Sequence, residues 1–186
     1  ALVVGGLVSS SFFVALTSLV QYVADPNRQL PELVYWLMGT LSRTEPRQLA
    51  WSAPLMLAGL AYICLNGKAV NALAMGDDEA RALGVQSMGM KLRLIGAATL
   101  ICSLTVVLAG VINWVGLVIP HVMRFIIGPD NRVGLAASAL GGALFVLLTD
   151  TLIRSVWTVE LPLGIATSLI SMPLFAFSLW YDWKRR

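Results

Sequence analysis

The chain has 186 residues, of which 58% are hydrophobic and only 12% are charged. Because soluble domains carry roughly 25% charged residues, this composition excludes an ordinary soluble domain and indicates an integral membrane protein. The net charge of +3 is informative through its distribution, and nothing in the sequence indicates a nucleic-acid partner. Cys64 and Cys102 lie in apolar runs, without the spacing of a metal site or a disulfide framework.

Charge-free apolar runs predict where the chain crosses a membrane, since a spanning helix needs about 20 apolar residues. The first run lacks the basic flank that opens a secretory signal. We therefore expect the chain to begin inside or just before a transmembrane helix. The runs cover residues 1–24, 48–67, 133–149 and 161–181, and the third is expected to extend past Asp150.

A further charge-free run, residues 94–123, is too long for one crossing. A straight helix of that length would measure about 45 Å, against a hydrocarbon core of about 30 Å. Gly110, Gly116 and Pro120 lie in its second half and predict a break near 110–116. The chain is thus predicted to be an all-α bundle of about six transmembrane helices.

The basic residues favour six spans over five. If 94–123 crosses the membrane twice, segment 66–93 and the C-terminus lie on one side with nine basic residues, and four lie on the other side. If it crosses once, the basic residues divide eight against five. Cytoplasmic loops carry an excess of Lys and Arg, so 66–93 and the C-terminus are predicted to be cytoplasmic. Residues 25–47 are then outside, and we expect a short interfacial helix there, with Pro31 at its first position and Gly39 at its end.

The longest polar interruption, residues 75–85, predicts a short helix. Asp77 can serve as its N-cap, Asp78 and Glu79 suit the positive end of the helix dipole, and Gly84 can provide a left-handed stop. A helix of about two turns is not stable alone, so this one packs on the chain or is bound by a partner. Helical spacing predicts an exposed face formed by Asp77, Ala80, Arg81 and Gly84, with Leu83 and Val85 available for other contacts.

No residues predict catalysis or a cofactor. The single histidine, His121, has no second metal donor nearby, and we interpret it as a structural histidine near a helix kink with a local hydrogen-bond partner. Gly67-Lys68 lacks the earlier glycine and the following hydroxyl of a phosphate-binding loop. The chain by itself is therefore not predicted to be an enzyme, to hold a metal or to need a cofactor, and any ATP hydrolysis belongs to another chain.

Two further features leave alternatives open. Asp150 and Arg154 are spaced to meet on one helix, either as a self-neutralising pair near the outer interface or as an arginine held for a partner; a proton-relay role for Asp150 is a third reading. Small and hydroxyl residues in the first span, including Ser9 and Ser10, suit close helix packing or a polar passage.

Five segments, in this order, give the chain a resemblance to the permease subunits of the iron-siderophore, haem and vitamin B12 family of ABC importers (type II importers). They are Tyr35-Trp36-Leu37-Met38-Gly39, Ala74-Met75-Gly76 through Ala80-Arg81-Ala82-Leu83-Gly84-Val85, Val115-Gly116-Leu117-Val118-Ile119-Pro120-His121, Gly128-Pro129-Asp130-Asn131-Arg132, and Glu160-Leu161-Pro162-Leu163-Gly164-Ile165. Such permeases have ten transmembrane helices, so the chain is similar to the last six, a single partial permease domain over 1–186.

The resemblance also implies partners. Segment 66–92 would be the cytoplasmic coupling segment, in which Gly76, Asp77, Asp78, Glu79, Ala80, Arg81, Leu83 and Gly84 would contact an ABC ATPase. Outer arginines would dock a periplasmic substrate-binding protein, with Arg154, Arg43 and Arg47 as the candidates. A second permease copy would complete a homodimer in the inner membrane of a bacterium or archaeon.

The cargo and the mode of transport have alternatives. The last span is expected to line the pathway, and in it Ser171 and Met172 stand in place of smaller residues. Ser9 and Ser10 in the first span are further candidates for lining the pathway. The resemblance implies a metal-chelate cargo of the iron-siderophore, haem or vitamin B12 type, and the bulk in the last span gives a small oxyanion such as molybdate or tungstate as the alternative. A stand-alone channel or secondary transporter would predict intramembrane charges or paired broken helices, and apart from Asp150 these are missing.

Overall fold

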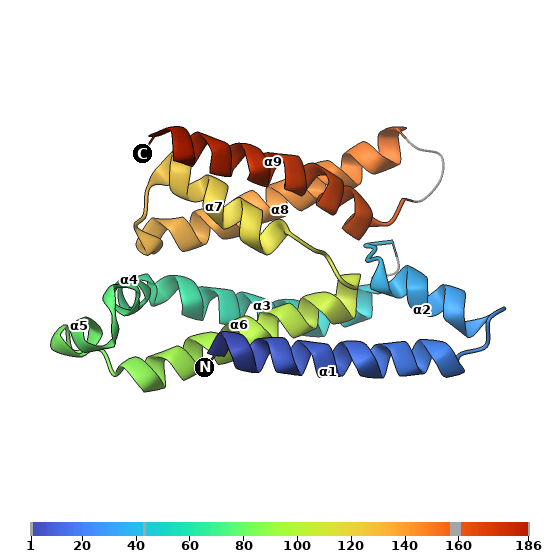
Figure 1. Ribbon diagram of the computed structural model, residues 1–186, viewed down its shortest axis with the longest axis horizontal. Helices are drawn as coiled ribbons and strands as arrows, with labels where there is room; N and C mark the ends of the chain where they lie inside the picture. Colours follow the sequence, from blue (N-terminus) through green and yellow to red (C-terminus); the bar gives the residue numbers. More distant parts are fainter. Residues whose placement is uncertain (1, 43, 157–160, 186) are drawn as a thin grey trace. The chain divides into compact units, whose positions relative to one another are not determined.

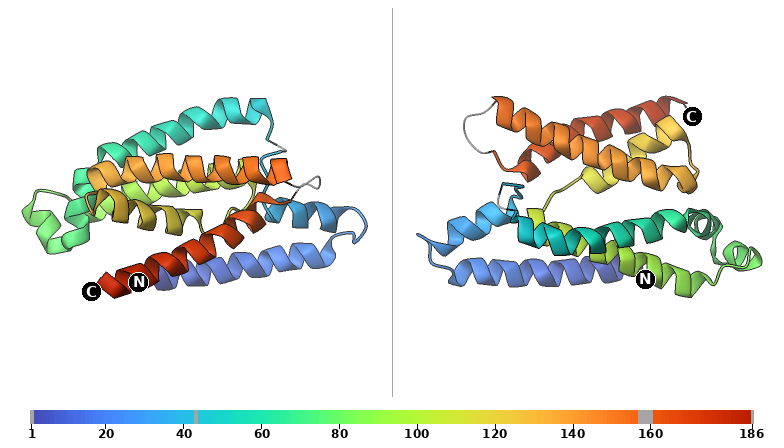
Figure 2. Two further views of the ribbon diagram at one scale, coloured as in Figure 1. Left: turned by 90° about the horizontal axis from the view of Figure 1, so that it is seen from above. Right: turned by 180° about the vertical axis from the view of Figure 1, so that it is seen from behind.

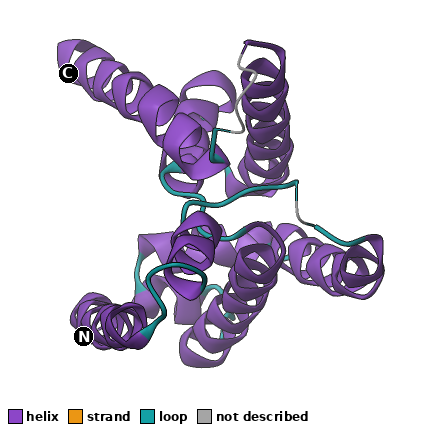
Figure 3. Ribbon diagram, turned by 90° about the vertical axis from the view of Figure 1, so that its right-hand side faces the viewer, coloured by secondary structure: helices purple, strands orange, loops and turns teal. Residues whose placement is uncertain are grey.

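The computed structural model describes residues 2–42, 44–156 and 161–185. These residues form helices and connecting loops, with no strand among them (Figure 3). Their contacts divide the chain into two units, Ala1–Leu37 and Met38–Arg186, each considered by itself. Arg43 and Glu160, which the sequence analysis singled out, lie outside the described residues.

The first unit contains α1 (Leu2–Val23) and α2 (Gln29–Leu37). Asp25 begins the turn between them, since its carboxylate accepts a hydrogen bond from the Asn27 N–H at 2.8 Å and its carbonyl accepts from the N–H groups of Gln29 and Leu30. The short helix is where the sequence predicts it, but it begins two residues before Pro31. Pro31 therefore lies within the first turn, where the missing N–H leaves no intrahelical bond unmade.

The second unit contains seven helices among its described residues: α3 (Pro46–Leu65), α4 (Gly67–Met75), α5 (Asp77–Ala82), α6 (Ser87–Ala109), α7 (Val115–Ile127), α8 (Asn131–Val156) and α9 (Leu163–Arg185). α3 packs along α6, α7 packs along α8, and α9 contacts both α7 and α8 (Figures 1 and 2). Small residues permit close packing. A Cβ at Gly59 on α3, for example, would lie 3.0 Å from the Ile101 side chain on α6.

The predicted spans coincide with helices, so the all-α membrane bundle is confirmed. By length and composition, four described helices can cross a membrane, Val3–Val23, α3, α6 and α8, while α7 and Leu163–Ala176 of α9 are shorter apolar helices. The predicted break in 94–123 is also present. Gly110 (φ +71°) ends α6, and Trp114 (φ +70°), the only described residue other than glycine with positive φ, precedes α7.

α7 departs from the prediction in length and position. Its 13 residues span about 20 Å at 1.5 Å per residue, less than a hydrocarbon core of about 30 Å. Arg124, the first basic residue after the run 94–123, lies in the last turn of α7, and the helix continues to Ile127 before Gly128 (φ +97°) ends it. The apolar run Phe125–Ile127 favours this extension.

The second unit has two ends, which we call the α5 end and the Gly39 end. At the α5 end lie α4, α5, the start of α6 and the α7–α8 connection; at the Gly39 end lie residues 38–42, the end of α6 and the start of α9 (Figure 1). Six of the nine basic residues predicted on one side lie at or near the α5 end, on α4, α5, the first turns of α6 and α8 or the last turn of α7. They are Lys68, Arg81, Lys91, Arg93, Arg124 and Arg132.

Candidate functional site

Glycines define both ends of α5. Gly76 precedes the helix at φ +129° and ψ 166°, a conformation that L side chains rarely adopt, and a Cβ there would meet the Glu79 carboxylate. At the other end the Gly84 N–H donates to the Arg81 carbonyl and the Val85 N–H donates to the Ala80 carbonyl, both at 2.9 Å. These bonds, with Gly84 at φ +81°, form a Schellman motif, so the predicted glycine stop is confirmed.

The predicted N-cap is wrong, because Gly76 occupies that position and Asp77 is the first helical residue. The Asp77 carboxylate instead binds Lys91 on α6, with 2.5 Å between Oδ1 and Nζ. This hydrogen bond is the main reason why the pKa of Asp77 lies below its usual value, with smaller contributions from the charges of Lys91 and Arg81. The ion pair thus ties the start of α5 to the first turns of α6.

The exposed face of α5 differs in part from the prediction. Arg81 and Gly84 are exposed as expected, but Ala80 is 0% exposed and packs inside the chain. The exposed residues also include Asp78, which forms an ion pair with Arg81 at 3.7 Å, and Leu83, which is 64% exposed. A six-residue helix cannot show hydrophobic periodicity, so the sequence did not indicate which of its small residues is buried.

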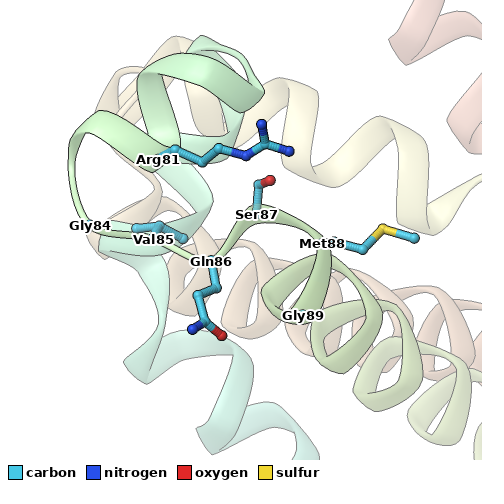
Figure 4. Close-up of a pocket in the computed structure, with 7 residues that line it drawn as sticks. All are labelled: Arg81, Gly84, Val85, Gln86, Ser87, Met88 and Gly89. Carbon is cyan, nitrogen blue, oxygen red and sulfur yellow. The ribbon is translucent and has the colours of Figure 1, made fainter.

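An open hollow of about 480 Å³ lies beside α5, between the end of α5 and the first turn of α6 (Figure 4). Its lining includes Arg81 from α5 and the segment from Gly84 to Gly89. In Figure 4 the Arg81 side chain extends over Ser87, while Gln86 points the other way. Met88 at its rim is 68% exposed. The α5 end therefore presents exposed apolar side chains, among them Leu83 and Met88, beside an open recess that the Arg81 side chain also lines.

A polar clasp joins α4 to the start of α8, and the sequence analysis missed it. Asn71 donates through Nδ2 to Asp130 Oδ1 at 2.6 Å, and its Oδ1 accepts from the Asn131 N–H at 3.0 Å and from Asn131 Nδ2 at 2.8 Å. Asp130 Oδ1 also accepts from the Arg132 N–H at 3.0 Å, as an N-cap does. The Arg132 N–H and the Asn71 amide lower the pKa of Asp130, in that order.

Close backbone approach supports the clasp. A Cβ at Gly67, the first residue of α4, would lie 2.8 Å from the Arg132 Cα and 2.9 Å from the Asn131 carbonyl oxygen. The beginning of α4 therefore lies directly against the beginning of α8, with no room for a side chain between them. The residues joined are about 60 positions apart in the sequence, which is why spacing gave no signal for them.

At the Gly39 end, backbone hydrogen bonds join three distant segments. The Thr40 N–H donates to the Ala109 carbonyl at 2.8 Å, and the Leu163 N–H donates to the Gly39 carbonyl at 2.9 Å. A Cβ at Gly39 (φ +75°) would lie 2.8 Å from the Val111 carbonyl oxygen, and one at Gly164 would overlap the Met38 carbonyl. These two positions require glycine because carbonyl oxygens occupy the space of a side chain.

Arg154 lies near the end of α8 at the same end of the unit. Its Nε donates to Asp150 Oδ2 at 2.8 Å, which confirms the predicted contact, and its Nη2 donates to Ser42 Oγ at 3.1 Å. The Arg154 side chain is 54% exposed, against 22% for Asp150. The guanidinium is thus oriented by two groups of this chain while one side of it faces outward. Arg47, in the first turn of α3, is exposed.

Residues 1–181 match the model of the FecCD transport family. The chain belongs to the FecCD transport family. It is 35% identical over 185 residues to the molybdate import system permease protein MolB of Haemophilus influenzae, which covers 99% of this chain and 54% of MolB. It is also 35% identical over 186 residues to the hemin transport system permease protein HmuU of Yersinia pestis, covering 100% of this chain and 54% of HmuU.

A solved structure agrees with the family assignment. It is described as an inward-facing conformation of a metal-chelate type ABC transporter, and it matches with a TM-score of 0.91 and 33% identity over 95% of this chain and 57% of that chain. The chain spans about half the length of the curated relatives that it matches. The resemblance inferred from five sequence segments is therefore confirmed, as is the helical permease fold.

Of the residues predicted to line a pathway in this FecCD-family chain, Ser171 is placed differently. It is 0% exposed, and its Oγ is enclosed without a hydrogen-bond partner among the described residues, so it does not face a passage beside this chain. Met172 next to it is half exposed, and Ser9 and Ser10 lie on an exposed part of α1. Adjacent residues of a helix point in different directions, which explains why Ser171 is buried while Met172 beside it is exposed.

His121 is held by aromatic rings rather than by the predicted local hydrogen bond. Its ring lies edge-on to those of Phe125 and Phe175, with centroids 5.0 and 5.7 Å apart, and its Nε2 is buried without a hydrogen-bond partner among the described residues. The described part of the chain contains no group of three or more His, Cys, Asp or Glu that could hold a metal ion.

Proposed function

We propose that this chain is part of the transmembrane permease of an ATP-driven importer in the cytoplasmic membrane of a bacterium or archaeon. A separate ABC ATPase would bind its α5 end, and a periplasmic binding protein would deliver cargo to its Gly39 end. Two permease copies would enclose the pathway between them. The relatives support this assignment, since MolB is named an import system permease and HmuU a transport system permease.

The observation that carries the proposal is the exposed apolar pair at the α5 end. Met88 lines the open hollow, and exposed Leu83 directly precedes Gly84, which also lines it. The backbone of this segment is fixed by Gly76, Gly84 and the Asp77–Lys91 ion pair. Apolar side chains that are exposed to water cost free energy, and a rigid platform for them reduces the ordering cost of binding. An ATPase partner that inserts a side chain into the hollow would cover them.

The ATPase interface is tested with Leu83→Asp in the full-length permease. A charge introduced at a desolvated contact costs several kcal/mol, so we expect at least a tenfold loss of co-purified ATPase. Leu65→Asp is the matched control, because Leu65 is an exposed leucine at the end of α3, outside the segment from α5 to the first turn of α6. Equal ATPase recovery with both variants would contradict the proposed interface.

The receptor interface is tested with Arg154→Glu. Arg154 and Arg47, with Arg43 as a sequence-based candidate, would pair with carboxylates of the binding protein. Charge reversal at Arg154 should weaken receptor binding and reduce its salt dependence, because one charge pair is lost. Asp150→Asn is the comparison, since it removes the charge of the intrachain carboxylate but keeps the guanidinium and its contact with Ser42. Unchanged affinity of Arg154→Glu at low salt would exclude docking through this residue.

Two cargo classes are consistent with the family. The first is a metal chelate, namely an iron-siderophore, haem or vitamin B12-type compound, as the name of HmuU indicates for that protein. The second is a small oxyanion such as molybdate or tungstate, as the name of MolB indicates for that protein. Uptake of labelled molybdate and of hemin into proteoliposomes, with and without ATPase and ATP, distinguishes the cargoes. Uptake that needs no ATPase would instead favour a stand-alone channel or secondary transporter.

A further inference from the structure

We infer that the Asn71–Asp130 clasp makes α8 the element that links the two partner-binding ends of the permease. This inference rests on the proposed function. α8 is one helix of 26 residues without an internal proline, about 39 Å long. Asp130 caps its first turn, and Arg154 lies in its last turn. The same rigid helix therefore begins at the α5 end and ends at the proposed receptor contact.

The clasp connects this helix to the coupling segment. Asn71 lies on α4, and a single residue, Gly76, separates α4 from α5. Asn71 uses its amide nitrogen and its carbonyl oxygen in three hydrogen bonds to Asp130 and Asn131. One of these bonds involves an ionised carboxylate, and charge-assisted bonds are about twice as strong as neutral ones. Backbone contact at Gly67 leaves no gap in which α4 and α8 could slide independently.

Other contacts tie α5 to a different helix. The Asp77–Lys91 ion pair joins α5 to α6, whereas the described side-chain hydrogen bonds between the α4–α5 segment and α8 or its capping residue run through Asn71. A displacement of α5 by a partner therefore reaches α6 through Lys91 and α8 through Asn71. Without the clasp, α8 and its Arg154 would lose their polar connection to the ATPase side.

Exchanging the hydrogen-bond donor and acceptor between positions 71 and 130 tests the clasp, because a second substitution can restore the bond that the first one breaks. Asn71→Asp replaces the donor Nδ2 by a carboxylate oxygen against the Asp130 carboxylate and should break the clasp by repulsion. Asp130→Asn combined with Asn71→Asp restores a donor–acceptor pair in the opposite direction. Asp130 Oδ1 accepts from both Asn71 Nδ2 and the Arg132 N–H. The introduced amide at position 130 must therefore turn its Nδ2 toward position 71 and its Oδ1 toward the Arg132 N–H, as an asparagine N-cap can. The double variant then restores the three hydrogen bonds of residue 71, and a merely destabilising change would not be rescued in this way.

The measurement is ATP hydrolysis by the full-length permease with its ATPase in proteoliposomes, with and without the soluble binding protein. We expect Asn71→Asp to retain basal hydrolysis and complex assembly but to lose at least fivefold in stimulation by the binding protein. The double variant should recover most of that stimulation. Asn27→Asp, the same change at an exposed asparagine outside the clasp, should behave as the unmodified protein does.

The outcomes separate this inference from the proposed function. Full stimulation in Asn71→Asp, or loss of stimulation that the double variant does not recover, would overturn the role of the clasp. Absence of ATPase binding or of stimulation in the unmodified protein would overturn the proposed function, and the inference with it. If Asn71→Asp is not recovered from membranes, Asn71→Ala removes the same three hydrogen bonds without adding charge, and its retained stimulation would likewise exclude the role.

Discussion

The burial of each residue on α5 determines whether its substitution tests partner binding or the stability of the chain itself. Ala80 and Ala82 lie two positions apart on α5, yet Ala80 is completely buried and Ala82 is exposed. Sequence reasoning chose Ala80 as a partner contact because its small size would permit close approach. The structure assigns that small size to the packing of α5 on its own chain, so Leu83 is the better probe of the ATPase.

We therefore expect Ala80→Trp to destabilise the permease itself. Overpacking a full site typically costs 1–3 kcal/mol or more, and an indole needs far more space than a methyl group. Membrane recovery and the melting temperature of the purified full-length protein should fall. Ala82→Trp is the matched control on the same helix and should leave both unchanged. Equal stability of the two variants would mean that Ala80 is not enclosed in solution.

The glycines at the Gly39 end provide a second matched pair. A Cβ at Gly164 would overlap the Met38 carbonyl and lie 2.8 Å from the Val111 carbonyl oxygen, whereas one at Gly142 within α8 meets nothing within 4 Å. Gly164→Ala should thus lower the melting temperature markedly. Gly142→Ala should be neutral or stabilising by about 0.5–1 kcal/mol, because alanine is the better helix former. The two variants melting alike would contradict the close approach at Gly164.

At the scale of elements, the sequence predicts helix positions well and contacts between helices poorly. Charge-free runs locate the spans because hydrocarbon excludes charge, and the break at Gly110 follows from glycine chemistry. The Asp150–Arg154 pair was predictable because it lies within one helix. The Asn71–Asp130 clasp was not, since nothing in local spacing indicates that a residue on α4 will meet the residue before α8, 59 positions later.

The Asp77–Lys91 pair makes a pH-dependent prediction about α5. The pKa of Asp77 is lowered in the fold, so its contribution to stability is present above the unfolded value of about 3.9 and is lost as the pH falls through the folded value. Asp77→Asn should lower the melting temperature slightly, by the same amount from pH 5 to pH 8, and the difference should vanish at lower pH. A difference that grows below pH 5 would contradict the ion pair.

At the scale of the whole molecule, the second unit separates its charges and its interaction surfaces along one direction. The α5 end carries six basic residues, the hollow and the clasp, and the Gly39 end carries the backbone junction and Arg154. Over most of their length the helices that connect the two ends carry no charged residues, as a membrane-spanning segment requires. From this basic excess the positive-inside rule predicts that the α5 end faces the cytoplasm, where the proposed ATPase would bind.

The orientation is tested by labelling single cysteines in the full-length permease, with its native cysteines replaced. Asp78, on α5, has a side chain that is 94% exposed, and Arg47 is exposed in the first turn of α3. A membrane-impermeant maleimide should label Asp78→Cys only in inverted vesicles and Arg47→Cys only in intact cells, because α3 separates the two positions across the membrane. Both should react after permeabilisation, which controls for accessibility. Labelling of both from the same side of an intact membrane would exclude a spanning α3 and, with it, the proposed separation of the ATPase and receptor ends.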